Sequence, residues 1–144
     1  MNENNRDFNL LAQKYGHAFI LINNAEFLLE ILLFKKGGLY QIDNKLKDKL
    51  LNKTTMGRKY ELSKHLIKNK KLNEDIQELI KKRNKIAHKW ITPFSGKGAD
   101  DWVFIGGGNI AEEVDDNFFD ETIQLAYNII KELIPISGVE KLEL

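Results

Sequence analysis

The stretch from residue 7 to residue 36 limits the fold more than any other part of the chain. Asp7 is a favourable helix N-cap and Gly37-Gly38 is a stop signal, so we expect one helix of roughly 30 residues, longer than most globular helices. At about 100° per residue, large apolar side chains fall on nearly every side of this helix. They are Tyr15, Phe19, Ile20, Leu21, Ile22, Phe27, Leu28, Leu29, Ile31, Leu32 and Leu33. A helix that is apolar almost all round is buried on more than one side. In a chain of 144 residues, we expect a second copy to supply part of that cover, which predicts a homodimer.

The rest of the chain predicts shorter helices around one core. The expected helices cover about 44–52, 55–68, 73–90 and 118–133. Asn73 is the expected N-cap of the helix over 73–90. That helix is expected to end before Pro93, and the helix over 118–133 before Pro135.

Residues 94–116 have a different character from the predicted helices. They are rich in glycine and contain the run Trp102-Val103-Phe104-Ile105, which is typical of a loop or a short hairpin. The sequence therefore predicts a single all-α domain over residues 1–144. It is a bundle of four to five helices with a long first helix and an insertion at 94–116 before the last helix.

Composition excludes some classes of site and location. The chain has no cysteine, which excludes disulfides and thiolate metal sites. The polar start, Met1-Asn2-Glu3-Asn4-Asn5, lacks the apolar core of a signal peptide. Asn23, Asn24, Glu26 and Glu30 interrupt the apolar stretches, so we expect no membrane span. A cytoplasmic protein is the expectation.

The positive charge is concentrated in one part of the chain. Residues 35–89 carry 17 Lys and Arg against 6 Asp and Glu, although the net charge of the whole chain is only +1. Such asymmetry is typical of a face that binds a polyanion. A solvated lysine-rich surface is the alternative, and charge alone does not decide between them.

The segment Arg83-Asn84-Lys85-Ile86-Ala87-His88 lies late in the helix predicted over 73–90. With Arg83 at 0°, Ala87 lies near 40°, Asn84 near 100° and His88 near 140°, so the four share one continuous arc. The small side chain of Ala87 leaves space between the neighbouring polar side chains, where a phosphate can approach.

Arg83 falls in the middle of an apolar stripe, where an unpaired guanidinium would be costly. Glu26 falls in the middle of a stripe on the first helix, with Asn23 one turn away. We therefore expect the two helices to pack together and Glu26 to bind Arg83. A purely structural ion pair is the alternative explanation for both residues.

An arginine and a histidine on one helical face provide much of what metal-independent RNA cleavage requires. The reaction needs a base for the 2′-hydroxyl, a proton donor for the leaving oxygen and a cation at the phosphate. Histidine titrates near neutral pH, and arginine binds phosphate with several donors. One chain offers one such histidine, His88, and a second copy across a dimer axis would supply the other. A packing or capping role for His88 is the alternative. We predict no metal and no cofactor.

The segment Arg83–His88 resembles the Arg-x(4–6)-His motif of the HEPN superfamily, in the local form Arg-Asn-x-x-Ala-His. The order of the helices extends this resemblance over roughly residues 7–135, and Asn23 and Glu26 match an Asn-x-x-Glu in the first helix. Members are helical bundles, usually dimers, and many are endoribonucleases of toxin–antitoxin, abortive-infection or CRISPR-linked systems. The resemblance implies catalytic roles for Arg83 and His88, with Asn84, Glu26 and Asn23 as supporting polar groups.

One position departs from some toxin members of that superfamily. They carry a tyrosine two residues after the histidine, which a partner nucleotidyltransferase modifies, whereas this chain has Trp90. Control by that route is therefore in doubt, although an antitoxin or nucleotidyltransferase remains the kind of partner that the resemblance implies.

Two functions follow from this sequence. The first is a dimeric endoribonuclease, with RNA held by the basic residues Lys64, Lys68, Lys81, Lys82 and Lys85. The alternative is a non-catalytic HEPN-like module that binds RNA, a nucleotide or a partner protein.

Overall fold

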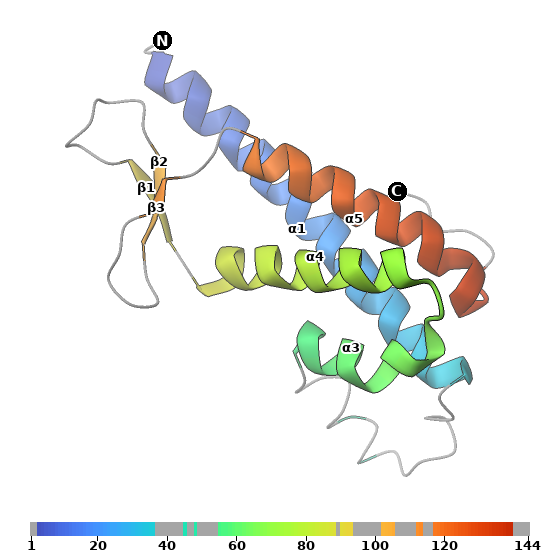
Figure 1. Cartoon of the computed structure of the whole chain (residues 1–144). Coiled ribbons are helices and arrows are strands. Elements are labelled where there is room, and N and C mark those ends of the chain that lie inside the picture. Colours follow the sequence, from blue (N-terminus) through green and yellow to red (C-terminus); the bar gives the residue numbers. More distant parts are fainter. Residues whose placement is uncertain are drawn as a thin grey trace.

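A computed structural model of the chain describes residues 3–36, 45, 48, 55–88, 90–93, 102–105, 112–113 and 117–139. The fold is mainly helical (Figure 1). Its elements are α1 (Glu3–Lys36), α3 (Met56–Ser63), the 3-10 helix η2 (Lys64–Leu66), α4 (Lys70–His88), three short strands and α5 (Phe118–Ser137). The long first helix and the helical bundle are confirmed. The helix expected over 44–52 lies outside the described residues, except Lys45 and Asp48, which are helical.

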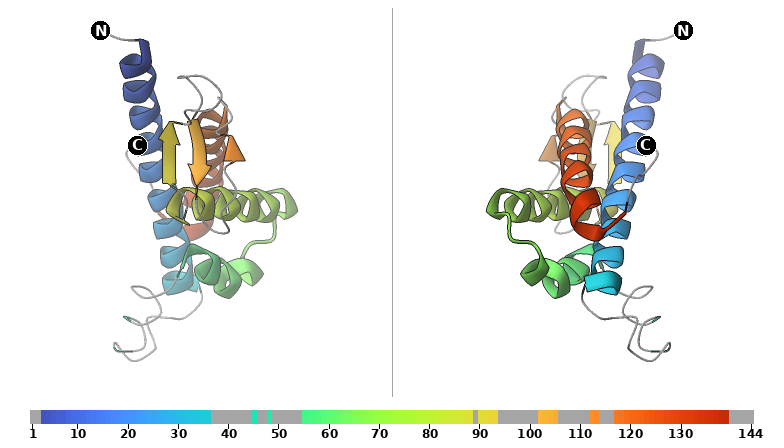
Figure 2. Two further views of the ribbon diagram at one scale, coloured as in Figure 1. Left: turned by 90° about the vertical axis from the view of Figure 1, so that its left-hand side faces the viewer. Right: turned by 90° about the vertical axis from the view of Figure 1, so that its right-hand side faces the viewer.

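The helix α1 runs parallel to α5. Lys14 of α1 pairs with Asp120 at the start of α5, and Lys35 near the end of α1 donates to the carbonyl of Gly138 just after α5. α4 runs antiparallel to α5: Asn69, just before α4, contacts Glu132 late in α5, and Lys82, late in α4, contacts Glu121 at the start of α5. α3 packs against both α1 and α4. α5 thus packs against both α1 and α4. Figures 1 and 2 show α5 alongside α1, with α4 crossing the pair at an angle.

The core is built from the inward faces of these helices. α1 contributes a row of alanine, leucine and isoleucine, including Ala18, Leu28 and Leu29, all fully buried. α5 contributes Phe119, Ile129, Ile130 and Leu133, and α4 contributes Leu72, Ile76 and Leu79. These side chains recur every three to four residues, as one buried face of a helix requires.

A small antiparallel sheet precedes α5. Two of its strands lie within residues 94–116, where we expected a loop or a short hairpin, and the first lies just before them, where the predicted helix would have ended. The strands are β1 (Trp90–Pro93), β2 (Trp102–Ile105) and β3 (Glu112–Glu113), in the order β1-β2-β3. Trp90 lies opposite Ile105, and Val103 opposite Glu113. The sheet lies beyond the end of α4, away from the helical core (Figure 1).

Several predicted helix ends are wrong by a few residues. α1 already includes Glu3, so Asp7 lies inside the helix. α4 begins at Lys70, because the side chain of Asn69 accepts the backbone N–H of Leu72, and Asn73 lies within the first turn. α4 ends at His88 because Trp90 belongs to β1.

The last helix continues through Pro135 to Ser137. Pro135 cannot donate a hydrogen bond to the carbonyl four residues earlier, and its ring crowds that carbonyl, which disfavours the helix locally. Ile134 and Ile136 on either side of it pack against the core, and this packing favours a helix that continues past the proline. The helix stops at Gly138, which has a φ of 78°, a left-handed conformation that favours glycine.

The helix α1 also has an apolar character beyond what the core uses. By length and hydropathy alone, the part Asn9–Lys36 is long and apolar enough to cross a membrane, contrary to our expectation from the interrupting polar residues. However, 44% of its most apolar window is buried inside the molecule, as in the core helix of a globular domain. Ile20 and Phe27 remain 59% and 49% exposed on the outer side.

Candidate functional site

The Arg83–His88 segment forms the last two turns of α4. Arg83 falls on the helix side that buries Ile76, Leu79 and Ile86, as the sequence predicted, but its own side chain is only partly buried. Asn84 and Ala87 are exposed. His88 is the final residue of the helix, and its side chain lies outside the described part of the structure.

Arg83 has a local partner, and none of the described acidic residues pairs with it. Its Nη1 donates to Oδ1 of Asn84 at 3.5 Å, at the limit of a hydrogen bond. Within the described residues, Arg83 forms no ion pair. A guanidinium that is part-exposed and not neutralised by a carboxylate keeps its charge available for an anion.

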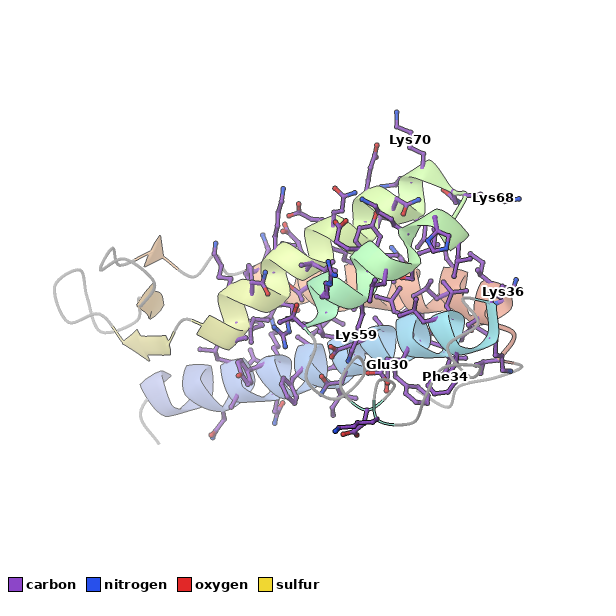
Figure 3. The ribbon with its side chains drawn as sticks, turned by 90° about the horizontal axis from the view of Figure 1, so that it is seen from below. Glu30, Phe34, Lys36, Lys59, Lys68 and Lys70 are labelled. Atoms are coloured by element: carbon purple, nitrogen blue, oxygen red, sulfur yellow. The ribbon has the colours of Figure 1, made fainter. Side chains whose placement is uncertain are left out.

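The predicted contact between Glu26 and Arg83 is wrong. Oε1 of Glu26 instead accepts from Nζ of Lys59 at 3.1 Å, and the same ammonium also bonds to Glu30. Figure 3 shows Lys59 reaching from α3 toward Glu30 on α1. The physical reason is the packing order: α1 packs mainly on α5 and α3, so α3 supplies the cation that meets Glu26.

Asn23 does not join the arginine either. It is exposed on α1, and no hydrogen bond from its side chain occurs among the described residues. The structure therefore brings Arg83 and Asn84 together, and leaves Glu26 with Lys59. The roles that the resemblance implied for Glu26 and Asn23 stay a prediction without structural support.

Lys59 is the charged residue that sequence reasoning missed. Its side chain is 5% exposed, whereas those of Glu26 and Glu30 are 17% and 24% exposed. The signal was present in the sequence: Met56, Lys59, Tyr60 and Ser63 follow the i, i+3, i+4, i+7 spacing of a buried face, and all four are buried. The lysine lies in the middle of that face, which calls for an acidic partner on the neighbouring helix.

A polar network joins α3 to the start of α4. The hydroxyl of Tyr60 donates to Oδ1 of Asn73 at 2.8 Å and accepts from Nε2 of Gln77 at 3.1 Å. Nδ2 of Asn73 donates to the carbonyl of Ile67 at 2.9 Å. These bonds fix the angle between the two helices and so position α4, which carries the motif.

The predicted RNA-binding lysines near the motif have local partners. Nζ of Lys82 lies 3.8 Å from a carboxylate oxygen of Glu121 and 4.9 Å from the centroid of the Phe118 ring, and Nζ of Lys85 lies 5.6 Å from the same centroid. Both ammonium groups are thus held against an aromatic face at the start of α5. Lys82 is well packed and poorly placed for a phosphate.

The other three predicted lysines are exposed. Nζ of Lys64 donates to a carboxylate oxygen of Glu61 at 2.7 Å, and this hydrogen bond raises the pKa of Lys64. Lys81 lies 4.0 Å from Glu78, a loose pair on the surface. Lys68 has no acidic partner among the described residues. Lys68 and Lys81 are therefore the better candidates for phosphate contact.

Comparisons of this chain with protein-family models, with curated proteins and with solved structures found no match. Among the described residues, no group of three or more metal-binding side chains is positioned to hold an ion. The chemistry open to the described site is phosphate binding by Arg83, next to a histidine at the end of the same helix.

Proposed function

We propose that this chain is a metal-independent endoribonuclease of the HEPN type, working as a homodimer on cytoplasmic RNA in a toxin–antitoxin or phage-defence setting. The observation that carries the proposal is Arg83: it is part-buried, it has no acidic partner among the described residues, and it precedes His88 by five residues on one helix. Arg83 can hold a phosphate group through its guanidinium. His88, on the same two turns of α4, can accept or donate a proton beside that phosphate.

In the proposed reaction, the 2′-oxygen of one nucleotide attacks the adjacent phosphorus, and the bond to the 5′-oxygen of the next nucleotide breaks. His88 takes the proton from the 2′-hydroxyl, and the His88 of a second copy gives a proton to the departing 5′-oxygen. Arg83 donates to the non-bridging oxygens, where negative charge grows in the transition state. The products are a 2′,3′-cyclic phosphate and a 5′-hydroxyl.

The assembly proposed for this reaction is supported by α1. Leu10, Tyr15, Phe19, Ile20 and Phe27 are large apolar side chains of α1 that remain exposed. Ile20 and Phe27 lie on the same side of the helix, within about 20° of each other at 100° per residue and opposite its buried face. Exposed apolar side chains that lie together are typical of a protein interface, and a second copy would cover these two. An antitoxin or a nucleotidyltransferase is the further partner that this proposal implies.

The test is RNA digestion in EDTA by wild type and His88→Ala. We expect cleavage to fall at least about 100-fold in the variant, the usual contribution of a general acid or base. His65→Ala is the matched control, because His65 is an exposed histidine on η2 away from the motif. RNA methylated at the 2′-oxygen should resist wild type.

Arg83→Ala completes the experiment. Its control is Arg58→Ala, which changes an exposed arginine of α3. Because Glu26 pairs with Lys59, removal of Arg83 leaves no described carboxylate without its partner. We therefore expect cleavage to be lost while thermal unfolding changes little. Full activity in His88→Ala, or no cleavage of any RNA by wild type, would favour the non-catalytic binding module instead.

A further inference from the structure

One exposed face of α4 connects the motif with a second group of basic residues. At about 100° per residue, Lys70, Gln77, Lys81, Asn84 and His88 fall within roughly 60° of one another around the helix axis. We call these five positions the outer face of α4. The first four are exposed, and the last is the motif histidine at the end of the helix.

The far end of this face carries lysines without carboxylate partners. Lys68, in the segment before α4, and Lys70, the first residue of α4, are exposed and form no ion pair among the described residues. Lys36, at the end of α1, is a third such lysine. Figure 3 shows all three side chains directed away from the helices, with Lys36 and Lys68 at the same end of the molecule. We call these three residues the basic end.

Lys14 and Lys71 are two lysines on the described helices that have carboxylate partners nearby. Lys14 pairs with Asp120 at 2.9 Å, and Lys71 pairs with Asp75 at 3.0 Å, which raises the pKa of Lys71. Lys71 follows Lys70 in sequence but lies about 100° away around the helix, off the outer face. Unlike Lys14 and Lys71, the three lysines of the basic end have no carboxylate partner in the part of the chain that the structure describes, so their ammonium groups can meet phosphates.

We propose that the basic end is a phosphate-binding surface for the substrate RNA, and that a single strand runs from it along the outer face of α4 to His88. This inference rests on the proposed function for the identity of the ligand as RNA. Lys68 and Lys70 hold phosphates at one end, Lys81 turns from its loose pair with Glu78 to a phosphate midway, and Asn84 lies next to the motif.

The length of α4 sets the length of RNA that can use both ends. Lys70 and His88 are 18 residues apart, which at a rise of about 1.5 Å per residue is roughly 27 Å. A stacked strand advances about 3.4 Å per nucleotide, so the track holds about eight nucleotides. A trinucleotide cannot reach from the motif to the basic end, whereas a decanucleotide can.

The experiment measures binding of 2′-O-methyl RNA, which is not cleaved, by wild type and by Lys68→Gln with Lys70→Gln. Each phosphate contact contributes about 0.7 to the slope of log affinity against log salt for single strands. We expect the double variant to bind a decanucleotide roughly tenfold more weakly at low salt, with a slope shallower by about 1.4. A trinucleotide can occupy only one end of the track, so it should bind wild type more weakly than the decanucleotide does.

The matched control is Lys14→Gln with Lys71→Gln, which removes two positive charges from positions off the outer face. The affinity of this control for the decanucleotide should stay within about twofold of wild type, because the inference makes binding depend on the position of the lysines more than on the net charge of the protein. Equal losses in both double variants, trinucleotide binding as tight as decanucleotide binding, or no binding of RNA by wild type would overturn the inference. Absence of RNA cleavage with this binding pattern intact would contradict only the proposed function.

Discussion

Lys59 and Lys64 lie in neighbouring turns of the chain and have opposite surroundings. Lys59 is buried between Glu26 and Glu30, whereas Lys64 and its partner Glu61 are each 54% exposed. A buried ammonium loses its hydration and depends on its two carboxylates, whereas an exposed pair stays in contact with water. The same residue type therefore has a structural role at one position and a minor one at the other.

Lys59→Met tests this difference at the residue scale. The change keeps most of the side-chain volume but leaves two partly buried carboxylates without their cation, so we expect the free energy of unfolding to fall by about 3 kcal/mol. Thermal or urea unfolding would measure it. Lys64→Met is the control and should leave stability nearly unchanged. Similar stability of the two variants would show that the buried pair contributes little.

Arg83 is more exposed than its place in the sequence pattern predicted. Its place in an apolar stripe predicted a buried ion pair, yet the side chain is part-exposed and bonds to its neighbour Asn84. The stripe is real, but near the end of a helix the core no longer surrounds every side, and a long side chain can carry its charged group to water.

At the scale of the element, the start of α4 depends on two asparagines with different tasks. Asn69 caps the helix by accepting the N–H of Leu72 at 3.2 Å. Asn73, one turn later, joins the helix to Tyr60 and to the carbonyl of Ile67. The first fixes where the helix begins, and the second fixes how it lies against α3.

Asn69→Ala should lower the free energy of unfolding by about 1 kcal/mol, the usual cost of losing an N-cap. Asn69→Ser retains an oxygen acceptor at the cap without adding a charge beside Glu132, and it is the rescue variant, expected to stay close to wild type in chemical denaturation. If Asn69→Ala proves as stable as wild type, the cap is not formed in solution.

At the scale of the whole molecule, the outer side of α1 is the least explained surface. α5 and α3 cover the other sides of the helix, but Ile20 and Phe27, two turns apart, remain largely in water. A second copy of the chain would bury them, and this is the assembly that the proposed reaction requires.

Ile20→Glu with Phe27→Glu should therefore convert a dimer into a monomer. Light scattering should give twice the chain mass of 16.7 kDa for wild type and the single mass for the variant. Gln124→Glu with Asn128→Glu introduces the same two charges at exposed positions of α5 and should leave the dimer intact. A monomeric wild type, or one that sediments with lipid vesicles instead, would contradict the dimer.

Much of the architecture could be read from local patterns. Cap and stop signals and apolar side chains predicted the long first helix, and the last helix was also predicted. The run Trp102–Ile105, typical of a loop or a short hairpin, forms a strand. Such patterns depend on residues close in sequence. Helix ends were less predictable: Asn69 and Asn73 are both good caps, and their competition is decided by the contacts of Asn73 with Tyr60 and Ile67.

By itself, the sequence determined the faces of the helices and the place of Arg83 and His88 on one of them. Only the tertiary structure decided which faces meet. Glu26 pairs with Lys59 rather than Arg83 because α3 packs on α1 where Glu26 lies, and no local pattern contains that choice. Helical periodicity fixes the direction of a side chain from its own backbone, but the partner of a buried charge depends on how distant segments pack, and that is a property of the folded chain as a whole.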